Sequence, residues 1–275
     1  MALIDLQRDV LALCFRAQPP ESVLAGLGNP GSWLMYREMV RERLLREIRV
    51  ALPRSCKLLG EAGLARGFEH FLEYAPPRTR FFREIVRGFV ESILPLMAAG
   101  GAPRSMSPAV HAAPRLDDPA DLSPNLPMPA PPALADLLRY ELSCWEVRDL
   151  EDYAGAPPAE FDFDRVPIVA PALRLLRVRY AIHRPPAADG GYAPGEHLLC
   201  LQRRGDAAQP QTWTLTPTTY RLLQRWQRAD CSVTESVQAL AREQNLRVDA
   251  AFIDGLCAAL AQFLEVGIVL GSRPA

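Results

Sequence analysis

The chain has few of the features that mark a membrane protein, a secreted protein or a self-contained enzyme. No apolar run approaches the roughly 20 residues that a helix needs to cross a bilayer. The N-terminus lacks a basic stretch followed by an apolar one, so we expect no signal peptide. The six cysteines are scattered and form no C-x-x-C pair, which is typical of reduced thiols in a cytoplasmic protein.

Familiar catalytic signatures are also missing. The sequence contains no Gly-x-Ser-x-Gly elbow, no phosphate-binding loop and no cysteine near a patterned histidine. Residues 26–31 spell G-x-G-x-x-G, but a helical pattern and Pro19-Pro20 precede them where a dinucleotide site needs a strand. We interpret this stretch as a loop between helices. His70 and Glu73 could face one metal ion, but one such pair is not a site. The sequence therefore predicts no catalytic residue, no metal and no cofactor in this chain.

Charge and composition divide the chain into segments. Residues 96–165 carry 12 acidic and 5 basic side chains, whereas both flanking regions are mildly basic. We expect a helical domain over 1–97, a Pro- and Ala-rich linker or disordered excursion over 98–132, and a helix over 133–150 that packs on the first domain. An acidic connector (151–165) leads to a second domain (166–275). The predicted class is α+β, with an all-helical domain followed by a winged-helix-like one.

The helical domain contains one strongly charged helix. It is predicted to begin near Ser32, a plausible N-cap, and to end at Leu52-Pro53. We expect one apolar side and one solvated charged side; the apolar side carries Leu34, Met35, Val40, Leu44, Leu45 and Ile48. The charged side carries Arg37, Glu38, Arg41, Glu42, Arg43, Arg46 and Glu47. Shorter helices are expected at 55–59, 62–73 and 79–94.

The second domain is predicted to place three strands before three helices. The strands are expected at 173–182, 197–202 and 212–215, and the helices at 218–228, 233–244 and 250–266. A three-stranded sheet in a winged-helix-like unit leaves a free edge, whose unpaired N–H and C=O groups can accept a peptide strand. The last predicted helix is apolar and contains no Lys or Arg. A strand edge beside such a helix favours a groove for a peptide.

Arginines provide the best case for an alternative function in DNA binding. They lie on the first predicted helix of the second domain and at a hairpin tip: Arg203, Arg204, Arg221, Arg225 and Arg228. A winged-helix DNA reader uses a late helix with polar and basic side chains in the major groove. The helix over 250–266 instead carries two acids, Asp254 and Glu265. The DNA-binding regulator therefore remains the second hypothesis.

The N-terminal region resembles a known bacterial family. Tyr36-Arg37, Leu52-Pro53 and Leu58–Glu61 resemble its "YR … L..P … LLGE" pattern, and residues 134–142 resemble its "L.DLARLEW" helix. The family was long labelled as DNA-binding, but its better-understood members are partner proteins of multinuclear iron oxygenases, such as the C component of methanobactin biosynthesis. The resemblance implies a heterodimer in which the oxygenase holds the iron and modifies a ribosomally made precursor peptide.

Residues 172–270 are similar to leader-recognition domains of the quinone-cofactor-chaperone type. The similarity rests on Trp213–Thr216, Tyr220–Leu223, Val233-Thr234, Phe263-Leu264 and Gly267–Leu270. In those domains the leader adds as a strand beside the third strand and packs on the third helix. The resemblance implies a peptide site formed by Thr212, Trp213, Thr214, Leu215, Ile253, Leu256, Cys257 and Leu260.

These resemblances and the missing catalytic motifs predict a non-catalytic partner subunit. It would bind the oxygenase through the helical domain and the inter-domain surface, and the precursor leader through the sheet edge. Iron is expected in the partner enzyme and no cofactor in this chain.

Overall fold

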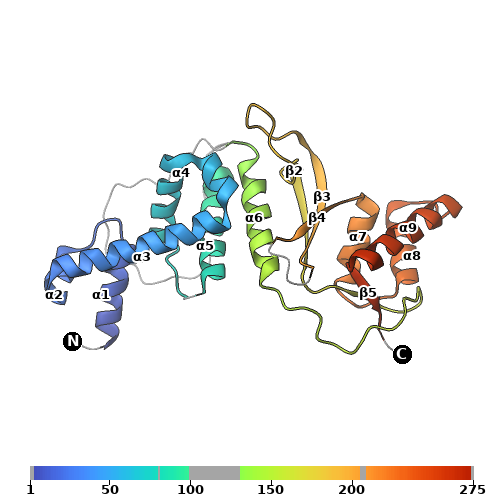
Figure 1. Ribbon diagram of the computed structural model, residues 1–275, viewed down its shortest axis with the longest axis horizontal. Helices are drawn as coiled ribbons and strands as arrows, with labels where there is room; N and C mark the ends of the chain where they lie inside the picture. The colour runs from blue at the N-terminus through green and yellow to red at the C-terminus, as the bar shows by residue number, and fades with distance from the viewer. Residues whose placement is uncertain (1–2, 80, 99–130, 205–208, 274–275) are drawn as a thin grey trace. The chain divides into compact units, whose positions relative to one another are not determined.

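A computed structural model describes residues 3–79, 81–98, 131–204 and 209–273 (Figure 1). The chain divides into two units, Met1–Leu142 and Ser143–Ala275. The first is helical and the second combines small antiparallel sheets with helices, which confirms the predicted α+β class. Most of the predicted linker, residues 99–130, lies outside the described residues.

The first unit is built from helices that follow one another closely. They are α1 (Leu3–Phe15), α2 (Glu21–Leu27), α3 (Pro30–Ala51), α4 (Pro53–Tyr74), α5 (Phe82–Ala98) and the beginning of α6 (Leu134–Arg148). The G-x-G-x-x-G stretch joins α2 to α3, as the sequence suggested. Helix α2 was not predicted. The predicted cap at Ser32 is wrong, because Asn29 is the N-cap of α3 and accepts a hydrogen bond from the Ser32 N–H at 3.4 Å.

The predicted solvated face of α3 is wrong for two of its arginines. Arg37 is only 6% exposed and Arg41 only 9%. The Arg37 guanidinium donates to the carbonyl oxygens of Leu13 and, at 3.0 Å, Ala17, while Arg41 donates to the Cys14 carbonyl and pairs with Glu69. The carbonyls of Leu13 and Cys14 belong to the last turn of α1, where backbone acceptors lack helical partners, and Ala17 follows two residues after this helix.

The same helix turns part of its predicted apolar side to solvent. Leu44 and Ile48 are buried as expected, whereas Leu34 and Met35 are exposed. Met35 is two residues before Arg37, about 160° away around the helix, so the burial of Arg37 places Met35 on the exposed side.

Helix α4 contains a break and is capped from a distant part of the chain. Gly60 leaves helical geometry with φ +66°, which matches the predicted separation of 55–59 from 62–73. The N-terminus of α4 has no side-chain cap of its own. Instead the Glu141 carboxylate, on α6, accepts from the backbone N–H of Arg54 at 2.9 Å and of Ser55 at 2.8 Å.

The second unit contains a three-stranded sheet and a two-stranded one. Strands β2 (Leu173–Tyr180), β3 (Pro194–Gln202) and β4 (Gln211–Leu215) pair antiparallel in the order β2-β3-β4. The short strands β1 (Pro167–Val169) and β5 (Val269–Ser272) pair with each other and were not predicted. Cys200 lies on the core face of β3, and Leu199 and Leu201 are also fully buried, so both faces of β3 are covered.

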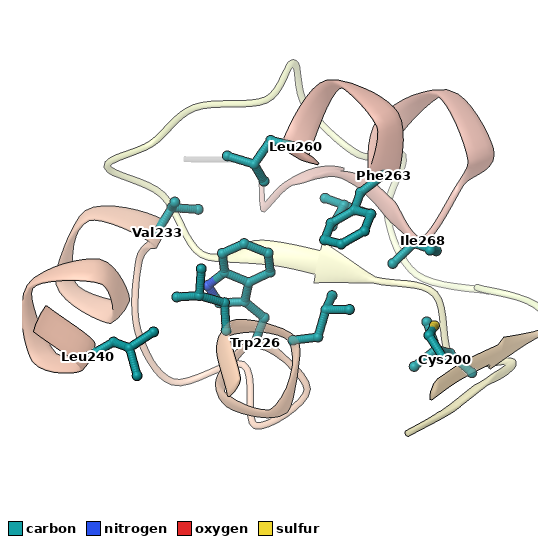
Figure 2. Packing of buried hydrophobic residues seen from close by; sticks show 11 residues of the cluster. Cys200, Trp226, Val233, Leu240, Leu260, Phe263 and Ile268 are labelled. Carbon is teal, nitrogen blue, oxygen red and sulfur yellow. The ribbon is translucent and has the colours of Figure 1, made fainter. Parts of the chain in front are cut away.

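Helix α7 (Pro217–Trp226) packs on β3 and β4, α8 (Val233–Gln244) packs on α7, and α9 (Ala250–Val266) contacts β5; buried side chains of all three helices join one hydrophobic cluster with Leu173 and Cys200 of the sheet. Each begins at a residue that sequence rules favour, because Thr216, Ser232 and Asp249 each accept a backbone hydrogen bond as N-cap. Figure 2 shows Trp226 between side chains of α8 and α9. Its indole N–H donates to the Ser236 hydroxyl at 3.1 Å, which satisfies the one polar group of this large buried side chain.

Candidate functional site

The sheet edge at β4 is open. β4 pairs with β3 along one side, with Trp213 opposite Cys200 and Leu215 opposite Leu198. Within the part of the chain that the structure describes, no strand pairs along its other side. The predicted strand and its position at an outer edge are therefore present. Backbone groups of successive residues alternate in direction, so part of those of β4 pair with β3 and the others face the side where a strand could be added.

The side chains of β4 alternate between two environments. Trp213 and Leu215 pack, partly buried, against the hydrophobic cluster around Trp226. Thr214 is exposed and Thr212 is half-buried on the opposite side of the strand. The Trp213 indole nitrogen is shielded from solvent and has no hydrogen-bond acceptor among the described residues. The edge thus has a rigid apolar side fixed by the core and a polar side formed by threonines.

The four predicted residues of α9 divide into two pairs. Leu260 is 2% exposed and belongs to the core, and Leu256 packs against the same cluster. Ile253 is 49% exposed and Cys257 is exposed as well. The structure therefore connects Trp213, Leu215, Leu256 and Leu260 through one hydrophobic cluster, while Ile253 and Cys257 form surface.

An additional residue extends this surface. Leu264 is partly exposed and lies eleven residues after Ile253, which at 100° per residue places the two side chains about 20° apart around the helix. Cys257 lies about 40° from Ile253 by the same spacing. We call Ile253, Cys257 and Leu264 the α9 shoulder, because they run along one flank of the buried stripe. The helical period could have indicated Leu264 from the sequence.

The five arginines of the alternative site do not form one cluster. The Arg203 guanidinium donates to the Leu150 carbonyl at 2.6 Å and to the Asp152 carboxylate at 2.9 Å. Arg203 and Arg204 line a hollow with Tyr153, Pro171 and other residues. Arg221, Arg225 and Arg228 line a different pocket, on α7, so the two groups serve separate surfaces.

The pocket on α7 has a volume of about 420 Å³ and holds charges of both signs. Arg177 of β2 pairs with Glu196 of β3, and Arg225 pairs with Glu243 of α8. The hydrogen bond from Arg225 lowers the pKa of the Glu243 carboxyl, so this acid remains ionised. Tyr220 also lines the pocket, and burial raises the pKa of its phenol, opposed by the nearby Arg177.

No metal cluster or membrane-spanning helix is found in the described ranges. No group of three or more His, Cys, Asp or Glu side chains there is arranged to hold a metal ion. None of the described helices combines the length and the apolar character that crossing a bilayer requires.

Comparison with known proteins gives a match in the second unit. Residues 170–264 match the family model of the HvfC C-terminal domain. Comparison with curated proteins gives no match. The matched residues run from just before β2 to near the end of α9, and they include β4 and the whole α9 shoulder. Over this region, about a third of its length, the chain is similar to the HvfC C-terminal domain.

Proposed function

We propose that this chain is a non-catalytic partner subunit that presents the leader of a ribosomally made precursor peptide to a multinuclear iron oxygenase. The observation that carries the proposal is the open edge of β4 in a unit whose last helix exposes apolar side chains. The match to the HvfC C-terminal domain supports an accessory role. In this proposal the iron belongs to the partner enzyme and this chain supplies no cofactor.

The edge and the helix would make different contributions to binding. Backbone groups of β4 would form main-chain hydrogen bonds with a leader strand, and these bonds give affinity with little dependence on sequence. Apolar side chains of the leader would contact the α9 shoulder and fix the register. Because Trp213 and Leu215 are anchored in the core, the edge is preorganised and less entropy is lost when a strand pairs with it.

The helical unit offers a surface for the oxygenase. On α3, Met35 is 68% exposed and Met39, one turn later, is 63% exposed, and Tyr36 beside them is also exposed. Methionine side chains are flexible and polarizable, and exposed apolar groups of this kind mark protein interaction surfaces. We propose this surface as the docking site for the enzyme.

A tagged pull-down from a native, nuclease-treated extract tests the proposal. Proteins and short peptides that are retained would be identified by mass spectrometry. We expect an iron oxygenase, together with a small precursor peptide. If neither is recovered, and duplex DNA is retained when nuclease is omitted, the result would instead favour the DNA-binding regulator.

A pair of matched variants tests the peptide site. Ile253→Glu places a charge on the α9 shoulder, and we expect it to weaken binding of the recovered peptide at least tenfold. Val248→Glu is the control, since Val248 is 45% exposed, also branched at Cβ, and lies just before α9. Thermal unfolding would verify that both variants fold. Equal peptide affinity for the two variants would contradict the proposed site.

The DNA alternative has weaker support. Arg203 and Arg225 are already paired with carboxylates, and α9 presents only acids among its charged residues. A helix without Lys or Arg has little with which to contact phosphates or bases.

A further inference from the structure

The pocket on α7 combines a recessed shape with unpaired positive charge. Arg221 and Arg225 lie one turn apart on α7 and so face the same side of this helix, and Arg228, two residues after its last residue, lines the same pocket. Arg177 of β2 contributes a fourth guanidinium from the sheet. We call this the α7 pocket.

Two of the four guanidinium groups are neutralised and two are not. Glu196 pairs with Arg177, and Glu243 pairs with Arg225. Arg221 faces the neutral side-chain amide of Gln244, whose oxygen accepts from the guanidinium at 2.7 and 3.1 Å in the orientation that satisfies both groups. For Arg228 no carboxylate lies within ion-pair distance among the described residues. The α7 pocket therefore has a net charge of about +2, which favours an anionic ligand.

The shape and lining of the pocket favour the carboxylates of a peptide over a nucleic acid. Leu198, Pro217 and Tyr220 supply apolar surface beside the guanidinium groups, which suits the aliphatic stem of an acidic side chain. Guanidinium groups bind carboxylates through two parallel hydrogen bonds. A duplex backbone would pass close to Glu196 and Glu243, and like charges would repel it.

One row of paired residues connects the pocket to the open edge. Arg177 lies opposite Leu198, and Leu198 lies opposite Leu215. Adjacent strands are about 4.8 Å apart, so the row from β2 to β4 spans roughly 10 Å. An extended peptide advances about 3.3 Å per residue, and three or four residues would therefore cover this distance.

We propose that the α7 pocket binds one or two acidic side chains of the precursor leader, a few residues from the segment that pairs with β4. This inference rests on the proposed function and adds an electrostatic determinant to it. Main-chain pairing tolerates many sequences, so an acidic anchor at a fixed distance would provide selectivity.

A display library of random 20-residue peptides, selected on the immobilised full-length chain, tests this inference. We expect enriched peptides to combine an alternating apolar segment with Asp or Glu about three to five residues from one end of that segment. Replacing the acids of a selected peptide by the corresponding amides is expected to weaken its binding at least tenfold at low salt.

The arginine variants provide the specific control. In the double variant Arg221→Gln and Arg228→Gln, the affinity for the acidic peptide divided by the affinity for its amide counterpart should fall to about one. The double variant Arg242→Gln and Arg247→Gln removes the same charge from exposed residues that do not line the pocket, and should retain the ratio. If the variant of Arg221 and Arg228 still prefers the acidic peptide by the original factor, the α7 pocket does not bind the acidic side chains.

The outcomes separate the two proposals. Failure to enrich any peptide, or enrichment that Ile253→Glu does not affect, would count against the β4 site itself. Peptides that depend on Ile253 but show no acidic preference would reject only the α7 pocket. Competition by millimolar inorganic phosphate without any effect of peptide charge would also reject it, in favour of a free-anion site. If a short DNA duplex competes with the peptide, the pocket would instead be assigned to DNA binding, in support of the regulator hypothesis.

Discussion

At the scale of single residues, burial gives chemically similar side chains different properties. The six cysteines all lie in the described part of the chain, none of them forms a disulfide, and Cys257 is the exposed one. Cys200 is fully buried in β3, and burial raises the pKa of its thiol to about 12. Burial, together with the nearby Glu141, likewise raises the pKa of Cys56 to about 12. At pH 8 only about one in 10⁴ of such thiols is ionised, so Cys56 and Cys200 are poor nucleophiles.

Alkylation with iodoacetamide at pH 8 should therefore begin at Cys257. Peptide mapping over time would show this thiol modified first, and Cys14 and Cys200 modified only after denaturant is added. Cys257→Ser should remove the fast phase. Rapid modification of Cys200 in the folded protein would show that the core of the second unit opens readily.

The same buried thiols predict a loss of stability in alkali. The folded-state pKa values of Cys56 and Cys200 lie above the unfolded value of 9.0, so above pH 9 the unfolded chain releases protons that the folded chain retains. This difference in protonation should leave the free energy of unfolding unchanged below pH 9 and lower it as pH rises towards 12. The limiting slope is about 1.4 kcal/mol per pH unit for each thiol.

Denaturant titrations at pH 8, 9, 10 and 11 would measure this slope. Cys200→Ala should reduce it, although the variant also creates a small cavity at all pH values. An equal slope with and without Cys200 would show that other groups cause the alkaline loss.

At the scale of elements, distant partners decide how helices end and which way they face. The N-terminus of α4 depends on Glu141, which is 86 residues away from Ser55 in sequence. The sequence pattern of 133–150 predicts a helix at about the right place, since α6 spans Leu134–Arg148. The pattern does not show that an acid on its buried side will cap another helix, because a cap across helices has no local sequence signature.

Replacing this cap should destabilise the first unit. Glu141→Ala leaves the buried N–H of Ser55 and the part-buried N–H of Arg54 without this acceptor, and we expect a loss of about 3 kcal/mol. Glu141→Gln retains one acceptor oxygen and should lose about half as much. Glu61→Ala is the matched control: it removes an acid from an exposed ion pair with Arg49 and should change stability by less than about 0.5 kcal/mol. Urea unfolding followed by circular dichroism would compare them, and equal losses for Glu141→Ala and Glu61→Ala would refute the capping role.

At the scale of the whole molecule, charge provides the clearest distinction between the two functions. The chain has a formal net charge of −1, and the five arginines of the alternative site are divided between two pockets, with Arg203 and Arg225 paired with acids. Binding to DNA requires a concentrated basic face and weakens steeply with salt.

We therefore predict no saturable binding of a fluorescent 20-base-pair duplex at 20 mM salt, measured by fluorescence anisotropy. Binding that falls steeply between 20 and 200 mM salt, and that is lost when Arg221 and Arg228 become glutamine, would establish the regulator instead. The pair Arg242→Gln and Arg247→Gln would control for the change in net charge.

The sequence by itself determined the local elements of the second unit and the division into a helical and a mixed region. Strands β2 to β4 and helices α7 to α9 lie close to their predicted positions, because alternating or helical apolar periods and N-caps at Thr216, Ser232 and Asp249 are local signals. The open edge of β4 follows from that order of elements. The peptide, oxygenase and cofactor assignments stay predictions.

The tertiary structure decided everything that depends on pairing across long stretches of chain. Strands β1 and β5 are three and four residues long and pair across about a hundred residues, so neither has a sufficient pattern alone. Arg37 and Arg41 face the carbonyls of Leu13 and Cys14 in the last turn of α1 because those acceptors need donors, although their charge predicted a solvated surface. Likewise, only the packing of α9 shows that Leu260 belongs to the core while Ile253 stays at the surface. An apolar helix presents similar side chains all round, and its neighbours determine which of them are covered.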